Sequence, residues 1–130
     1  MGLSPGGESG DFDDEPVLYV ADTLNNRIAV IHDPFKRSAP SVNGKTLTTG
    51  GTLNAPLGLT VAPNGHIITV NGNDGFATEI TPDGHQIASR LLDDTGGPPP
   101  GVGTLFGVLF DPEVGLIFVD DGSNTLNTLQ

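Results

Sequence analysis

Oxygen-bearing side chains gather in three short loops of the sequence, each lying between two apolar runs. Carboxylate and amide oxygens are the ligands that hard cations such as Ca²⁺ prefer, so loops of this kind that converge on one point would form a cation site. The oxygen-bearing residues are Asp22, Asn25, Asn26, Asn71, Asn73, Asp74, Asp120, Asp121 and Asn124. Arg27, which follows the first loop, completes the set of candidate binding residues. For a bound Ca²⁺ or other divalent cation, the expected ligands are Asp22, Asn71 and Asp120.

A purely structural role explains the same residues. Asn and Asp are frequent in hairpin loops because they tolerate positive φ and hydrogen-bond to their own backbone. None of the three loops has the spacing of an EF-hand. Asp22 and Arg27 are expected to form an ion pair that holds the first loop. Both the structural and the binding hypothesis therefore stay open.

Two histidines form a second candidate metal group. His66 and His85 each follow a hairpin glycine, and His32 is expected on the same side of the molecule. A zinc site would need a further protein ligand, for which Asp111 or Glu113 is the candidate. Histidines in turns are more often ordinary surface residues.

Covalent catalysis finds no support, and no catalytic residue is predicted. The chain has no Cys and no Gly-x-Ser-x-Gly motif. The acidic pairs at 93–94 and 120–121 consist of adjacent residues, which point to opposite faces of a strand. The Gly-rich run at 95–101 lacks the Lys and the following helix of a phosphate-binding loop.

The stretch 58–94 supplies the framework that must position these loops. It contains four short apolar runs, at 58–62, 66–71, 76–81 and 85–92. Pro-Asn-Gly at 63–65 and Pro-Asp-Gly at 82–84 join them in pairs, and this turn chemistry predicts hairpins with a bulge. We therefore expect one antiparallel sheet of four strands and an all-β chain.

The flanking sequence repeats this layout. An apolar run, an Asn/Asp-rich loop and a second apolar run occur at 18–31, 67–80 and 116–129, and we align Val20, Val70 and Val119 as equivalent. A related strand and turn precede the later two copies, at 56–65 and 105–115. Repeats of about 50 residues are typical of propellers and solenoids.

The run Leu-Tyr-Val-Ala-Asp-Thr-Leu-Asn-Asn-Arg-Ile-Ala-Val-Ile at 18–31 resembles the core of an NHL repeat. The resemblance implies a β-propeller, usually of six blades, with the innermost strand of each blade first. It weakens along the chain, because neither later copy keeps an Arg at the position of Arg27.

Counted against that template, the chain is a partial β-propeller of about three antiparallel four-stranded blades. The expected blades span about 16–50, 56–94 and 104–130, after an acidic, flexible Gly/Ser-containing tail at 1–15. We expect ten strands, three in the first blade, four in the second and three in the third, with no sequence for the innermost strand of the first blade.

The composition of the chain excludes some classes of binding partner. The formal net charge is -11, from 16 acidic and 5 basic residues, and such a field repels nucleic acid and anionic membranes. No apolar run is long enough for a membrane span, and residues 1–10 lack the basic and apolar parts of a signal peptide. The absence of Cys leaves the compartment open, including an extracytoplasmic one for the parent protein.

The incomplete ring suggests two kinds of partner. Either further blades of a longer propeller cover the two open flanks, or copies of the chain associate, most simply as a homodimer of six blades. The loop at 34–45 carries Phe35, Lys36 and Arg37 in an acidic chain, which suits self-association or a protein partner, although a flexible insertion is the simpler alternative.

Two functions are compatible with these residues. The favoured one is a non-enzymatic propeller module that binds protein or glycan, self-associates and needs no cofactor. The alternative is a metal-dependent hydrolase or lyase with a cation at the propeller centre.

Overall fold

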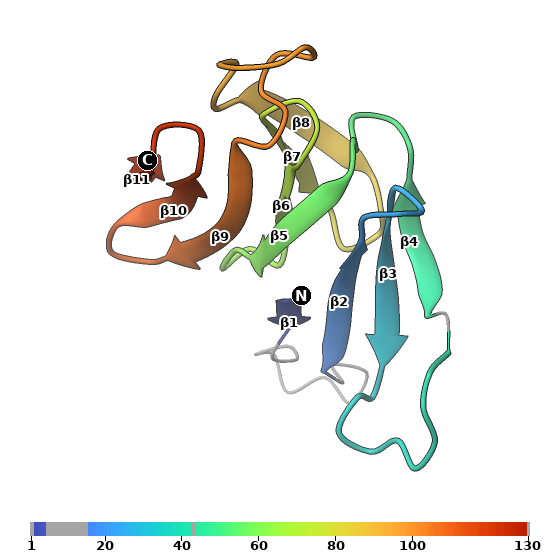
Figure 1. The fold of residues 1–130 in the computed structure, drawn as a ribbon. Helices are drawn as coiled ribbons and strands as arrows, with labels where there is room; N and C mark the ends of the chain where they lie inside the picture. The colour runs from blue at the N-terminus through green and yellow to red at the C-terminus, as the bar shows by residue number, and fades with distance from the viewer. Residues whose placement is uncertain (1, 5–15, 43, 130) are drawn as a thin grey trace.

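The computed structural model describes residues 2–4, 16–42 and 44–129, and every regular element in them is a β-strand. Figure 1 shows these strands as separate groups that fan out side by side. Their bounds are β1 Gly2–Ser4, β2 Val17–Asp22, β3 Arg27–His32, β4 Lys45–Thr49, β5 Pro56–Val61, β6 Ile67–Asn71, β7 Phe76–Ile80, β8 Gln86–Leu91, β9 Leu105–Asp111, β10 Gly115–Asp120 and β11 Thr125–Leu129.

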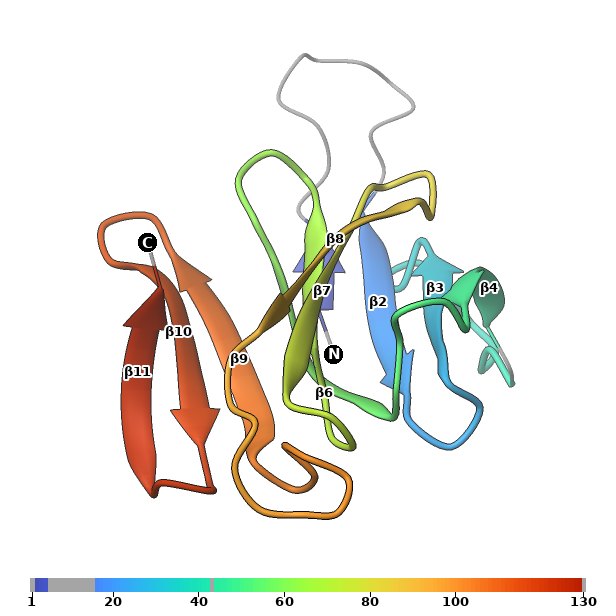
Figure 2. The ribbon, with the colours of Figure 1, turned by 90° about the horizontal axis from the view of Figure 1, so that it is seen from above.

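The strands form three antiparallel sheets, which we call blades 1, 2 and 3. Their strand orders are β1-β2-β3-β4, β5-β6-β7-β8 and β9-β10-β11. Neighbouring strands are consecutive in the chain, so each blade is a simple meander built from hairpins. Seen from above in Figure 2, the three blades stand next to one another in chain order.

The two predicted turns form as their residue types require. The Gly65 N–H bonds to the Ala62 carbonyl at 2.9 Å, and the Gly84 N–H bonds to the Thr81 carbonyl at 2.9 Å. Both glycines have positive φ, 85° and 93°, the conformation in which a side chain is unfavourable. The hairpins of blade 2 are therefore encoded locally.

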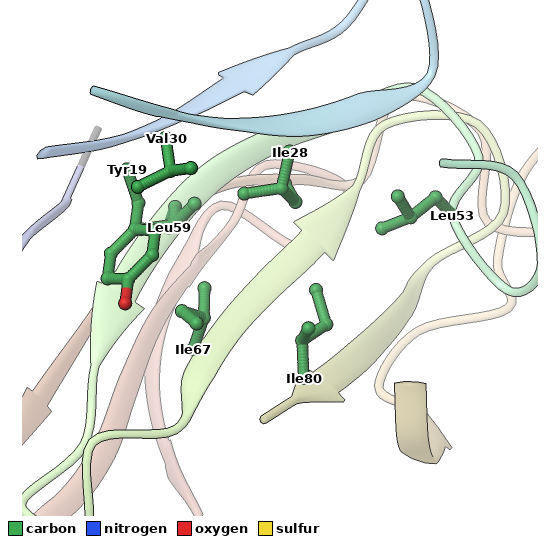
Figure 3. Close-up of a cluster of buried hydrophobic side chains, with 7 residues drawn as sticks. All are labelled: Tyr19, Ile28, Val30, Leu53, Leu59, Ile67 and Ile80. Carbon is green, nitrogen blue, oxygen red and sulfur yellow. The ribbon is translucent and has the colours of Figure 1, made fainter. Parts of the chain in front are cut away.

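The blades pack face to face through two apolar clusters. Figure 3 shows the cluster between blades 1 and 2, where Tyr19, Ile28 and Val30 meet Ile67 and Ile80. Both isoleucines of blade 2 are fully buried, which stabilises the fold by about 2 kcal/mol per side chain. A second cluster joins blades 2 and 3 and contains Val70, Ala77, Leu105 and Phe118.

The strand count differs from the prediction at the N-terminus. Blade 1 has an innermost strand, because Gly2–Ser4 pairs antiparallel with residues 17–19 of β2. The described residues thus form eleven strands, divided four, four and three, where ten were expected. Of the predicted tail, residues 2–4 form this strand, while residues 5–15 lie outside the described part of the chain.

The structural repeat is also shifted by one residue in blade 1. Asn26, Gly75 and Asn124 all have positive φ, at 56°, 74° and 58°, and they close equivalent loops. Counting back five residues from each of these three positions aligns Ala21, and not Val20, with Val70 and Val119. Because strand residues alternate between faces, this one-residue correction changes which side chains of blade 1 correspond to the interface residues of the others.

Among the residues that the structure describes, no helix is long and apolar enough to cross a membrane.

Candidate functional site

The first polar loop is held together by Asp22. Its carboxylate accepts hydrogen bonds from the Asn25 backbone N–H at 3.2 Å and the Asn25 side-chain amide at 2.9 Å. It also forms the predicted ion pair with Arg27, whose Nε lies 2.9 Å from Oδ2. The bonds from Asn25 and then Arg27 hold the pKa of Asp22 below its usual range. The carboxylate thus stabilises its own loop.

Asn26 connects blade 1 to the segment that enters blade 2. Its Nδ2 donates to the Leu53 carbonyl, and its Oδ1 accepts the Ala55 backbone N–H, both at 2.9 Å. Residues 50–55 lead directly into β5, so one amide side chain fixes the approach of the next blade.

Asn71 performs the same task from inside blade 2. It is fully buried, its Oδ1 accepts the Asn54 backbone N–H at 3.0 Å, and its Nδ2 donates to the Thr52 carbonyl at 2.8 Å. A buried amide must be hydrogen-bonded to be tolerated, and these bonds to the preceding linker satisfy it. Asn71 is therefore a structural link between blades 1 and 2.

The other polar residues of this loop also bind within the junction. Asp74 accepts the Phe76 backbone N–H at 3.0 Å and the Asn54 side-chain amide at 3.3 Å. The Asn73 amide donates to the Asn54 side chain at 3.3 Å. The carboxylate of Asp74 thus accepts hydrogen bonds both from its own hairpin and from the linker before blade 2.

The loop of blade 3 follows the same plan. Asp120 is buried and accepts the Ser123 backbone N–H at 3.1 Å, as Asp22 does with Asn25. The backbone N–H of Asp121 donates to the Thr104 carbonyl at 2.6 Å, while its side chain is exposed. Asn124 closes the loop with positive φ.

The structure brings together two carboxylates that the sequence did not connect. A Cβ built on Gly122 would lie 3.0 Å from an Asp93 oxygen and 3.2 Å from an Asp120 oxygen, so both oxygens face the same glycine. Both residues are buried. Hydrogen bonds from Thr95 hold the pKa of Asp93 below its usual range against the opposing effect of burial. Sequence reasoning missed the pair because Asp93 lies in the connection after β8 and Asp120 lies in blade 3, 27 residues apart in the chain.

The predicted histidine group is arranged differently from a metal site. The His66 Nδ1 lies 2.7 Å from Glu79 Oε1 on the facing strand of blade 2, and His85 and His32 are exposed. Asp111 accepts the backbone N–H groups of Glu113 and Val114 at 2.8 and 3.0 Å and so shapes its own hairpin. Within the described residues, no group of three or more His, Cys, Asp or Glu could hold a metal ion.

The polar side chains of the three loops stabilise the fold by hydrogen bonding. Asp22, Asn71 and Asp120 each make their hydrogen bonds within their own loop or with the adjacent linker. A cation coordinated by the three residues would compete with these bonds.

A second candidate surface lies on the open side of blade 3. Cross-strand pairing places Ile117 opposite Leu109, and Val119 opposite Leu126, on the side of the sheet that faces away from blade 2. We call these four residues the forward face of blade 3. Leu109, Val119 and Leu126 are 58%, 44% and 71% exposed. Sequence reasoning treated these residues as ordinary strand positions, although the predicted open flanks were a signal for such a surface.

Comparison with known proteins supports the architecture. No family model matches the chain, and no curated protein matches it. Among solved structures, the chain is similar to streptogramin B lyase, with a TM-score of 0.64 and 15% identity over 92% of this chain. It is similar to the calcium-binding protein regucalcin from Agrobacterium tumefaciens, with a TM-score of 0.59 and 17% identity over 78% of the chain.

A third likeness is to a catalytically inactive virginiamycin B lyase from Staphylococcus aureus with quinupristin, with a TM-score of 0.58 and 19% identity over 98% of the chain. This chain spans 35%, 33% and 40% of the three solved chains.

The three stacked meander sheets and these likenesses define the class: the described chain is an all-β partial β-propeller. At such low identity the likeness concerns the fold alone. The assignment of the repeat to the NHL family remains a prediction.

Proposed function

We propose that this partial propeller is a binding module that recognises another polypeptide through the forward face of blade 3. The observation that carries the proposal is the apolar, exposed character of Leu109, Val119 and Leu126 on one open sheet face. Contiguous apolar surface of this kind marks interaction sites. An aliphatic face suits a protein partner better than a glycan, because sugars need polar partners.

The enzymatic alternative has a weaker basis. Two of the similar structures are lyases and a third is a calcium-binding protein, which is why a metal-dependent hydrolase or lyase is worth weighing. In this chain, however, the oxygens of the candidate ligands Asp22, Asn71 and Asp120 are used in bonds that hold loops and blades together. A divalent cation would have to replace those bonds.

Site-specific photocrosslinking tests the binding function. Benzoylphenylalanine in place of Leu126 should crosslink to a polypeptide in an extract of cells that express the protein. The same probe at Leu24, which is 92% exposed on a loop of blade 1, is the control for non-specific contact. Equal crosslinking at the two positions, or none at either, would argue against the proposal.

The metal alternative is tested on the purified chain by calorimetric titration with CaCl₂. We expect no stoichiometric binding in the micromolar range. Binding of one equivalent, lost in Asp22→Asn and Asp120→Asn, would favour the alternative.

A further inference from the structure

The open face of blade 1 is equivalent to an interface that the molecule already uses. Leu18 and Ile31 lie opposite each other on β2 and β3, and with Val20 we call them the back face of blade 1. One repeat later, 49 residues along the chain, the same register pairs Ile67 with Ile80. Those two isoleucines are fully buried against blade 1. Leu18 and Ile31 are therefore placed as the apolar half of a blade-to-blade contact.

The forward face of blade 3 is the other half of the same contact. Two repeats earlier, its residues Ile117, Val119 and Leu126 correspond to Tyr19, Ala21 and Ile28. In blade 1 these three residues pack against the cluster that contains Ile67 and Ile80. The chain thus carries one copy of each side of its own interblade interface without a neighbouring blade. The forward face of blade 3 is largely exposed, and Leu18, Val20 and Ile31 of the back face are half-buried.

We propose that these two faces bind each other between two copies of the chain. The forward face of blade 3 in one copy packs on the back face of blade 1 in the second, and the contact occurs twice about a two-fold axis. Two copies then close a ring of six sheets and leave neither apolar face exposed. This inference rests on the proposed function, because it names a second copy as the polypeptide that the forward face recognises.

The charges of the two blades are complementary, although the whole chain is acidic. Residues 105–129 contain four acidic residues and no Lys or Arg, a net charge of -4. Residues 16–50 contain four basic and two acidic residues, a net charge of +2. Opposite potentials on two docking surfaces favour their encounter and disfavour the pairing of like blades.

The long loop of blade 1 lies where this contact would form. Residues 34 and 37–41 line a shallow, open groove of about 400 Å³ together with Leu18 and Ile31 of the back face. In blade 2 the corresponding short turn reaches the preceding blade, since a Cβ on Gly84 would meet the Leu47 carbonyl. The longer loop of blade 1 would reach a preceding blade in the same way, with Phe35 and Val42 exposed at 72% and 87%.

The proposed arrangement of the two copies also brings oppositely charged side chains together. The loops after the first and third strands of a meander lie at the same end of its sheet, so the β9–β10 hairpin and the long loop share one side of the ring. Arg37 of one copy would then face Asp111 and Glu113 of the other. These contacts lie at the rim of the apolar interface and orient the two copies.

Sedimentation equilibrium of the purified 130-residue chain between 1 and 100 µM is the first test. We expect a dimer of twice 13.4 kDa. Leu126→Lys should weaken the dimer roughly tenfold or more, because it places a charge in a central apolar contact. The matched control Leu24→Lys alters a loop residue that is 92% exposed and should leave the dimer unchanged.

Charge reversal tests the orientation. Arg37→Glu and Glu113→Arg should each weaken association, and the double variant should recover part of the loss. Benzoylphenylalanine at position 126 should crosslink to residues 18–41 of an isotopically labelled second copy. A wild-type monomer at 100 µM, a dimer insensitive to Leu126→Lys, or crosslinks to another region would overturn the inference. Crosslinking to a different protein in place of a second copy would overturn this inference without overturning the proposed binding function.

Discussion

Single polar residues do more for this fold than their loop positions suggest. Asn26 and Asn71 each use both ends of a side-chain amide to hold the linker before blade 2. The sequence showed that these residues favour loops, and it correctly paired Asp22 with Arg27, five residues away. The sequence could not show the bonds of Asn71 to residues 52 and 54. Residues so far apart in the chain meet only when blade 2 and the linker before it have folded together.

Asn71→Ala should destabilise the chain by about 2–3 kcal/mol, because it removes a fully buried side chain and leaves the Thr52 carbonyl and the Asn54 N–H without their partner. The change is measured by urea unfolding followed by circular dichroism. Asn73→Ala removes one exposed bond of 3.3 Å and should cost less than about 0.5 kcal/mol. Equal losses for both variants would contradict the linking role of Asn71.

The buried carboxylate of Asp93 should make the unfolding free energy depend on acid. Its pKa in the folded state is lowered from 3.8, so its contribution is present above that pH and is lost as the pH falls through the folded pKa. Asp93→Asn should therefore flatten the dependence of the unfolding free energy between about pH 5 and 2.

Thr95→Val provides the graded comparison for this acid dependence. It removes the hydroxyl that contributes most to the shift but keeps the backbone N–H bond of 2.7 Å, so it should lose part of the slope. A slope that is the same in both variants and the wild type would assign the acid sensitivity to other groups.

Strands and turns were the most predictable level of this molecule. The strand Lys45–Thr49 and the hairpin turns at 63–65 and 82–84 follow from local residue chemistry, and the structure confirms them. The strand Gly2–Ser4 was missed because three residues carry no β-signal of their own and pair only through β2. The one-residue misalignment of Val20 arose because neighbouring apolar residues of a strand look alike in sequence although they face opposite sides.

The two equivalent glycines Gly58 and Gly107 give a test of blade packing. A Cβ on Gly58 would meet the Phe106 carbonyl of β9, and lie 3.0 Å from the Val108 nitrogen, so Gly58→Ala should force the blades apart and cost about 1–3 kcal/mol. Gly107→Ala meets only a Val119 methyl at 3.8 Å and should be nearly neutral. Both are compared by urea unfolding in the Leu126→Lys background and at low protein concentration, where association contributes least.

At the scale of the whole molecule, the repeat explains both the fold and its open surfaces. Each interface joins the forward face of one blade to the back face of the next, and three blades in a row leave one face of each kind uncovered. The sequence predicted the number of blades and their open flanks. Which residues face outward required the register of the strands, since a one-residue shift exchanges the two faces.

If those faces bind each other, thermal stability should depend on protein concentration. A dimer that dissociates on unfolding gains stability by mass action, so the melting temperature should rise by roughly 3 °C for each tenfold increase in concentration. Leu126→Lys should reduce this dependence while keeping the monomer folded, because the side chain is 71% exposed in the single chain. Differential scanning calorimetry across two decades of concentration measures both effects. A melting temperature that is constant for the wild type would mean that the apolar face of blade 3 stays uncovered by a second copy.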